Sequence, residues 1–166
     1  MARKVLGAAL VLVMLLIFPG VSHALTTNQK PLVGLEGVQV VVEGPGPEGE
    51  RLGLSKNQIK TDVERRLRKA GIRVLTNQEQ VETPGTPHLY VKISASINKM
   101  GIFDYSINVD LIEIVTPFTG GTAFATVWET GEAGSVGLNN INQIQPRINS
   151  LVDRFINDYL AANPKR

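Results

Sequence analysis

The stretch "HLYVKISASINKMGIFDYSINVDLIEIVT", residues 88–116 of the 166-residue chain, decides the fold. In its first part, residues 88–98, apolar side chains at odd positions alternate with mostly polar ones at even positions. This period of two predicts a strand with one solvent-exposed face. A turn centred on Gly101 leads into a second alternating run at residues 105–116, and "TAFATVWET" at residues 122–130 is a third. Consecutive alternating runs predict an antiparallel meander.

Two amphipathic helices flank the meander. Ser55, followed by Gln58, has the pattern of a capping box, and apolar residues then recur at helical spacing. Gly71 fits the left-handed position just past the end of this helix. A second helix is predicted to begin at about Asn142 or Pro146 and to end at Ala162, with a broad apolar face.

Two more strands are predicted upstream, at residues 38–43 ("VQVVVE") and 72–75 ("IRVL"), which makes the order β-α-β-β-β-β-α. This order predicts an α+β, two-layer sandwich, with a mostly antiparallel sheet of about five strands and two helices on one face. Residues 25–37 show no period and are expected to form a loose lead-in. Residues 38–166 are then a single domain.

The N-terminus predicts export. Arg3 and Lys4 precede an apolar run at residues 5–18, and small residues follow at positions 22 and 24. We expect a signal peptide, residues 1–24, that is cleaved after Ala24, and hence a periplasmic or secreted protein. The alternative is a retained membrane anchor, for which the run is shorter than the ~20 residues needed to span a bilayer.

Cysteine and charge exclude several classes of protein. The chain has no cysteine, so it is not a lipid-anchored lipoprotein and has no disulfide, cysteine nucleophile or thiolate metal site. It contains 17 Lys and Arg residues against 15 Asp and Glu, and without Arg3 and Lys4 the two signs balance at 15 each. Net charge therefore gives no reason to expect nucleic acid as a partner.

The helix-to-strand step "VERRLRKAGIRVL" (residues 63–75) and the element order carry a resemblance. They resemble small bacterial envelope domains, namely the N-terminal domain of the Tol–Pal translocation protein and the lipopolysaccharide-assembly lipoprotein, in which two helices cover a four-stranded sheet. The resemblance covers most of residues 38–162 and implies an exported α+β envelope domain. The lipid-anchor cysteine of that lipoprotein is missing here, and a shared fold does not transfer function.

The stretch "GPGPEG" (residues 44–49) matches the glycine pattern of dinucleotide-binding loops. Such loops bind pyrophosphate through backbone N–H groups at a helix N-terminus. Pro45 and Pro47 have no N–H group to donate, and Glu48 would repel a phosphate. We predict a loop that binds no cofactor.

Few residues suit catalysis. His88 is the only histidine after Ala24, and the chain contains no G-x-S-x-G or H-E-x-x-H motif. We therefore predict no catalytic residue and no metal site. The alternative is a small carboxylate-dependent hydrolase of a cell-wall or glycan substrate. Its two carboxylates would come from a set of five: Asp104, Asp110, Glu113, Glu129 and Glu132.

The second and third segments of the meander predict a binding patch. If "PFTGG" closes a hairpin with Thr116 opposite Thr122, even-numbered residues share one face of the sheet, and the odd-numbered ones, with the small Ala123 and Ala125, face the helices. The even face then gathers an exposed apolar patch, which consists of Ile112, Ile114, Phe124 and Trp128. Alternatively, residues 25–37 or the loop after Trp128 cover this patch. A register slip of one residue would exchange the two faces.

A basic cluster on the first helix is a candidate secondary contact for an anionic partner, and it consists of Arg65, Arg66, Arg68 and Lys69. Alternatively, these cations complement the helix dipole on a solvated face.

Taken together, these features predict an exported, non-catalytic binding or assembly module. It would recognise an envelope protein, lipid or glycan through an open sheet face. The alternatives are the hydrolase and a subunit of a homo-oligomer with a self-complementary patch.

Overall fold

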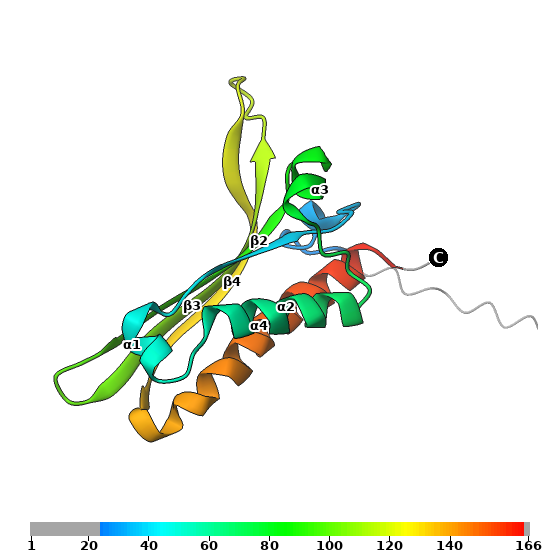
Figure 1. Ribbon diagram of the computed structural model, residues 1–166. Coiled ribbons are helices and arrows are strands. Elements are labelled where there is room, and N and C mark those ends of the chain that lie inside the picture. Colours follow the sequence, from blue (N-terminus) through cyan, green and yellow to red (C-terminus); the bar gives the residue numbers. More distant parts are fainter. Residues whose placement is uncertain (1–23, 165–166) are drawn as a thin grey trace, which may run out of the picture.

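The computed structural model describes residues 24–164, so the predicted signal peptide lies outside the described residues except for Ala24. Its centre is a four-stranded sheet in the order β1-β2-β3-β4 (Figure 1). The strands are β1 (Gln39–Glu43), β2 (His88–Ile97), β3 (Ile102–Val115) and β4 (Ala123–Gly137). β1 runs parallel to β2, while β2–β3 and β3–β4 are antiparallel. The chain is thus an α+β protein with a mostly antiparallel sheet.

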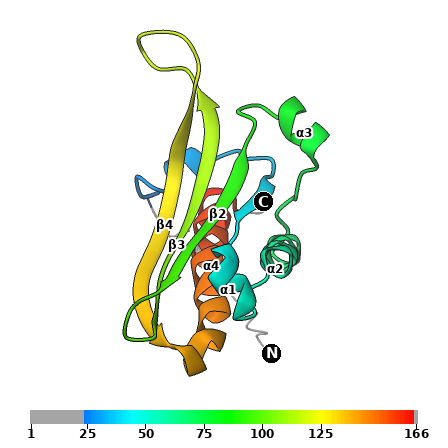
Figure 2. The same cartoon turned by 60° about the vertical axis from the view of Figure 1, so that its left-hand side comes forward.

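Two long helices lie on the same side of this sheet (Figures 1 and 2). They are α2 (Lys56–Lys69) and α4 (Ile144–Ala162). Two short helices, α1 (Gly46–Arg51) and α3 (Asn77–Glu82), and two 3-10 turns, η1 (Lys30–Leu32) and η2 (Leu138–Gln143), complete the described chain.

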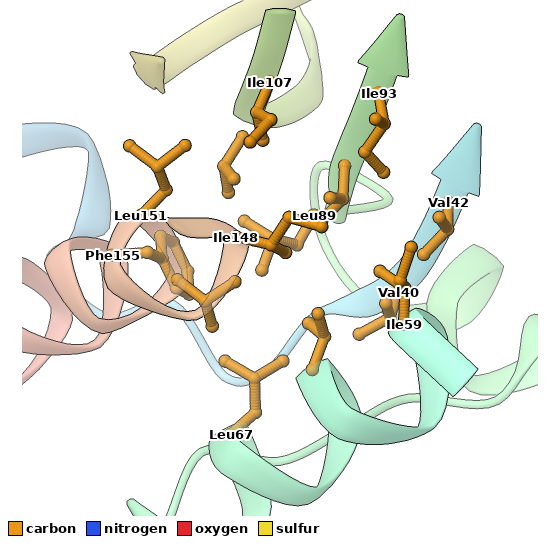
Figure 3. Packing of buried hydrophobic residues seen from close by; sticks show 14 of the residues in the cluster. Val40, Val42, Ile59, Leu67, Leu89, Ile93, Ile107, Ile148, Leu151 and Phe155 are labelled. Carbon is orange, nitrogen blue, oxygen red and sulfur yellow. The ribbon is translucent and has the colours of Figure 1, made fainter. Parts of the chain in front are cut away.

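The core lies between the two layers (Figure 3). Odd-numbered side chains of β2 and β3, such as Leu89 and Ile107, are fully buried under the helices. They meet Ile148 and Phe155 of α4 and Leu67 of α2, which are also 0% exposed. Burying each side chain of this size contributes ~1.5–3 kcal/mol, so the predicted period of two is what joins the sheet to the helices.

The predicted ends of the long helices are confirmed. The Ser55 hydroxyl accepts a hydrogen bond from the N–H of Gln58, and Gly71 has a φ of +82° just past the end of α2. α4 begins at Ile144, with Pro146 in its first turn, where the missing N–H of proline costs nothing.

The predicted strand at residues 72–75 is wrong, and the sheet has four strands instead of five. Only Val74 pairs with the sheet, through a single bridge to Val38. The Val38 N–H donates to the carbonyl of Arg73, and the Leu75 N–H donates to the carbonyl of Val38. The chain then turns into α3, so the pairing is not extended into a strand.

Two helices were missed, so the prediction of two helices is also wrong. α1 occupies the stretch predicted to be a loop around Pro45 and Pro47. α3 begins in the polar stretch after Leu75 with a full capping box: the Thr76 hydroxyl accepts from the Glu79 N–H at 3.2 Å, and the Glu79 carboxylate accepts from the Thr76 N–H at 2.8 Å. This T-x-x-E pattern was readable in the sequence.

The lead-in, residues 25–37, is irregular apart from η1, but it packs against the domain. Leu32 is fully buried. The Tyr159 hydroxyl donates to the carbonyl of Leu35 at 3.0 Å, and Asn163 Nδ2 donates to the carbonyl of Leu32 at 2.8 Å. The lead-in is thereby fixed to the C-terminal end of α4.

Candidate binding surface on the open sheet face

The sheet face opposite α2 and α4, here called the open face, changes in character along the strands. At one end, Ser106 of β3 pairs with Ser94 and Ala133. In the middle, Asp110 pairs with Tyr90 and Glu129. At the other end, Ile114 pairs with Phe124. The open face therefore runs from small and polar, through charged, to apolar.

A bulge in β4 determines which side chains reach the open face. The predicted pairs Ile114–Phe124 and Ile112–Thr126 are confirmed. Between Leu111 and Ile112 the register shifts, so that Leu111, not Asp110, pairs with Trp128. One extra residue in β4, Val127, reverses the faces of everything after it.

Trp128 consequently lies on the helix-covered face, which corrects its predicted place in the patch. Its side chain is 2% exposed and meets Phe155 edge-on, with ring centroids 5.2 Å apart and an interplanar angle of 74°. The indole Nε1–H donates to Asp158 Oδ2 at 2.9 Å. Asp158 Oδ1 accepts from Gln29 of the lead-in, also at 2.9 Å. Trp128 thus joins β4, α4 and the lead-in.

The other patch residues lie on a hairpin, residues 112–126, here called the arm. The arm extends beyond the helix layer (Figures 1 and 2). Ile114 is 36% exposed and Phe124 67% exposed. Phe118 at the tip is 108% exposed, and no residue from 114 to 126 carries a charge. Phe118 is not one of the four predicted patch residues, although the turn "PFTGG" places it at the tip of the hairpin.

The base of the arm is fixed by one hydrogen bond, from the Ile114 N–H to the Gly85 carbonyl at 2.8 Å. Glu113 lies beside Gly85, and burial raises the pKa of the Glu113 carboxyl. Ala123 was predicted to face a helix, but it is exposed because the arm reaches past α4.

The middle of the open face holds two like charges. Asp110 and Glu129 lie directly opposite each other in adjacent strands, an arrangement that is destabilising unless it is compensated. Burial, and then the Glu129 charge, raise the pKa of Asp110. Both carboxylates line a shallow depression of about 320 Å³, together with Asn108, Thr130 and Gly131. Lys92, whose charge lowers the pKa of Asp110 in part, pairs with Glu43 at 3.7 Å.

The other three candidate carboxylates do not join this pair. Asp104 accepts from Ser135 Oγ at 2.6 Å, at the small polar end of the open face. Glu132 lies on the helix side, where it accepts from Arg147 at 3.2 Å. Glu113 is on the arm. Of the five, only Asp110 and Glu129 could act on one substrate.

The basic cluster of α2 is largely neutralised. Arg65 pairs with Asp62 at 2.8 Å, Arg66 with Asp153 of α4 at 2.8 Å, and Arg68 with Glu64 at 3.1 Å. Arg65, Arg66 and Lys69 line a pocket of about 130 Å³. The ion pairs favour a solvated, helix-stabilising role over a strong anion site.

His88, the only histidine in the described part of the chain, lies on the open face next to the arm. Its ring meets Phe124 edge-on, with centroids 6.1 Å apart. Within residues 24–164, no group of three or more metal-ligating side chains comes together, and no helix is long and apolar enough to cross a bilayer.

Comparison with models of known protein families and with characterised proteins finds no match to this chain.

Proposed function

We propose that the protein is an exported, non-catalytic binding or assembly module of the bacterial envelope. The observation that carries the proposal is the arm, a hairpin that carries no charge from residue 114 to residue 126, whose tip residue Phe118 is 108% exposed and whose stem exposes Phe124. Aromatic side chains that stay in water cost free energy, and they are typical anchors of interaction surfaces. The binding role predicted for the patch that included Trp128 is thus assigned to the apolar end of the open face.

Export to the envelope is supported by the N-terminal sequence, in which a basic pair precedes an apolar run of signal-peptide length. The partner belongs to one of three classes, namely an envelope protein, a lipid or a glycan. Their shared requirement is an apolar surface that can cover Phe118 and Phe124.

A photo-crosslinking experiment tests the proposal. The phenylalanine analogue p-benzoylphenylalanine replaces Phe118 or Phe124 in cells that make the full chain, and the adducts after illumination are identified as protein, lipid or glycan. The matched control is the same analogue at Met100, which is 79% exposed in the β2–β3 turn at the other end of the molecule. We expect discrete adducts from positions 118 and 124 and none from 100. Equal labelling from all three positions, or no adduct at 118 and 124, refutes a specific contact of the arm.

The Asp110–Glu129 pair supports a second candidate, the carboxylate-dependent hydrolase, because the pKa of Asp110 is raised as a general acid requires. The pair lies on an open sheet, however, and not in a cleft that excludes water. Release of soluble sugar from purified cell wall separates the two candidates. We expect the wild-type chain and the Glu129→Gln variant to be equally inactive, whereas activity that is lost on this substitution would favour the hydrolase.

A further inference from the structure

The outer edge of β4 is an unpaired strand. The backbone of β4 hydrogen-bonds with β3 on one side, and no backbone hydrogen bond joins its other side to any segment within residues 24–164. Its bonds to α4 are made by side chains, among them those from Arg154 to Thr130 and from Arg147 to Glu132. Figure 2 shows β4 at the margin of the sheet. An edge of this kind presents a row of free N–H and C=O groups that can accept another strand.

The two edges of the sheet differ. β1 has only five residues, and the bridge between Val38 and Val74 covers its start. β4 has 15 residues, and its pairing with β3 is regular from Glu129 to Gly137, past the bulge. Proteins usually protect such edges with proline or lysine, and β4 contains neither.

Small side chains leave this edge accessible. Along the regular part of β4, Gly131, Ala133 and Ser135 point to the open face and are exposed. Gly134, on the other face, has no side chain to screen the backbone. Between Gly131 and Ser135, a strand could therefore approach to the ordinary spacing of about 4.8 Å. At Thr130, the Arg154 side chain of α4 lies beside the strand and donates a hydrogen bond to the Thr130 hydroxyl at 3.3 Å.

Charge decides which strand fits. Glu129, where the regular part of β4 begins, and its partner Asp110 in β3 both lie on the open face. Neither forms an ion pair with a described residue. A cationic side chain on an added strand would lie next to Glu129 and relieve the repulsion between the two carboxylates. A second copy of this chain that paired through its own β4 would bring no cation on that strand, because the charged residues of β4 are Glu129 and Glu132.

We propose that β4 binds an extended peptide that carries lysine or arginine on alternate residues, by adding it as a fifth strand along Glu129–Gly137. Main-chain hydrogen bonds would supply the affinity, as in other cases of strand addition. The contact of a cation with Glu129 would supply the preference for basic over acidic peptides. The proposal does not depend on the arm, because the arm and this edge are different surfaces.

Hydrogen exchange of the full chain tests the proposal. The probe is a capped peptide of alternating lysine and valine, long enough to span Glu129–Gly137, and its matched control has glutamate in place of lysine. We expect the lysine peptide to protect alternate amides of β4 and the glutamate peptide to bind at least about fivefold more weakly. Absence of protection in β4, or equal binding of both peptides, overturns the proposal.

Two N-methylated peptides separate strand addition from simple charge attraction. One carries N-methyl groups on every lysine and the other on every valine. Successive N–H groups of a strand point in opposite directions, so for a peptide that binds in one fixed direction only one of the two modified peptides can still pair with β4. We expect one to lose binding and the other to keep it. An equal effect of both modifications means that side-chain charge alone holds the peptide, and the proposal is wrong.

Protein variants complete the test. Glu129→Lys should reverse the preference in favour of the glutamate peptide, whereas Glu50→Lys on α1 should change nothing. A variant with Phe118→Ser and Phe124→Ser should keep peptide binding, so that failure of the arm and failure of the edge are distinguishable. Sedimentation of the chain without peptide tests whether a second copy of the chain binds to the β4 edge instead. A dimer in which the β4 amides are already protected would make the second copy the partner and would overturn the proposal.

Discussion

At the residue scale, two glycines of β4 show how β3 side chains shape the sheet. A Cβ atom at Gly131 would lie 2.8 Å from Asn108 Oδ1 and 2.9 Å from the carbonyl oxygen of Ile107. A Cβ atom at Gly134 would lie 2.7 Å from the Tyr105 hydroxyl. The two β3 side chains lie over the glycines, one on each face of the sheet, and occupy the space that β4 leaves empty.

We therefore expect Gly131→Ala to destabilise the protein by about 1–3 kcal/mol, the usual cost of overpacking. Part of this cost cannot be relieved by a rotamer change, because the Ile107 carbonyl belongs to the backbone of β3. Urea unfolding followed by circular dichroism measures the change. The control is Ala133→Ser, at an exposed position two residues on, which should stay within about 0.5 kcal/mol. Equal stability of both variants would mean that β3 and β4 adjust freely at this point.

Trp128 gives a direct optical test of the bulge. Because its ring is buried against Phe155 and its Nε1–H is bonded to Asp158, we expect a blue-shifted emission that iodide does not quench. Trp128 is the only tryptophan, so the signal has one source. The same chain unfolded in guanidinium chloride should emit in the red and be quenched strongly. A red, quenchable emission from the folded chain would place Trp128 on the open face and would refute the register found here.

At the element scale, local patterns were sufficient for most of the fold. The period of two in residues 88–116 and the cap at Ser55 depend on neighbours in the sequence, and both predictions hold. The bulge could not be predicted in this way, because apolar residues at odd positions continue from Ala123 and Ala125 to Val127, as in a regular strand. Only the adjacent apolar pair Val127–Trp128 indicates that the strand can change faces there.

The predicted binding patch shows the consequence of the extra residue in β4, Val127. Three of its four predicted members, Ile112, Ile114 and Phe124, precede the bulge along the hairpin and share the open face as expected. Trp128 follows the bulge and is buried. The strand predicted at residues 72–75 failed for a different reason, since a short β-branched run cannot reveal that the sheet has no room to extend its pairing beyond Val38.

The short helix α3 should be sensitive to acid. The pKa of Glu79 is lowered from 4.5 to about 2, first by the hydrogen bond from the Thr76 N–H and then by Arg73. Since its folded-state pKa lies below the ordinary value, Glu79 stabilises α3 fully above about pH 4.5, and this contribution disappears as the pH falls toward 2. We expect the protection factors of the α3 amides, which are corrected for the intrinsic pH dependence of exchange, to fall as the pH decreases. In Glu79→Gln, which cannot titrate, that fall should vanish. If it persists in this variant, another group controls α3.

At the scale of the whole molecule, the described chain is a two-layer body with one extension. α2 and α4 cover the sheet on one side, and the lead-in closes the end of this layer through Asn163 and Tyr159. The arm receives none of this cover, because α4 ends before reaching it (Figure 1). The stability of the fold and the binding that we propose for the arm are thus assigned to different parts, and a deletion can separate them.

Removing the arm tests this separation. Replacing residues 114–124 with Asn-Gly joins Glu113 to Ala125, which already pair across the hairpin, through a two-residue turn that suits antiparallel strands. The deleted part exposes Phe118 and Phe124 and contributes one hydrogen bond to the rest of the chain, from Ile114 to Gly85. We therefore expect cooperative unfolding with a free energy within about 1.5 kcal/mol of the wild type.

Function should respond in the opposite way to stability. The arm-deleted chain should lose partner capture, measured by crosslinking through a benzophenone placed on a cysteine that replaces Thr126, at the new end of the hairpin. The same label at position 126 of the otherwise intact chain is the control and should crosslink, because the arm beside it still holds the partner. If the deletion keeps full crosslinking, the contact surface lies on the remaining open face. If instead the deletion abolishes cooperative unfolding, the arm belongs to the folding core, and its exposed aromatics need a structural explanation.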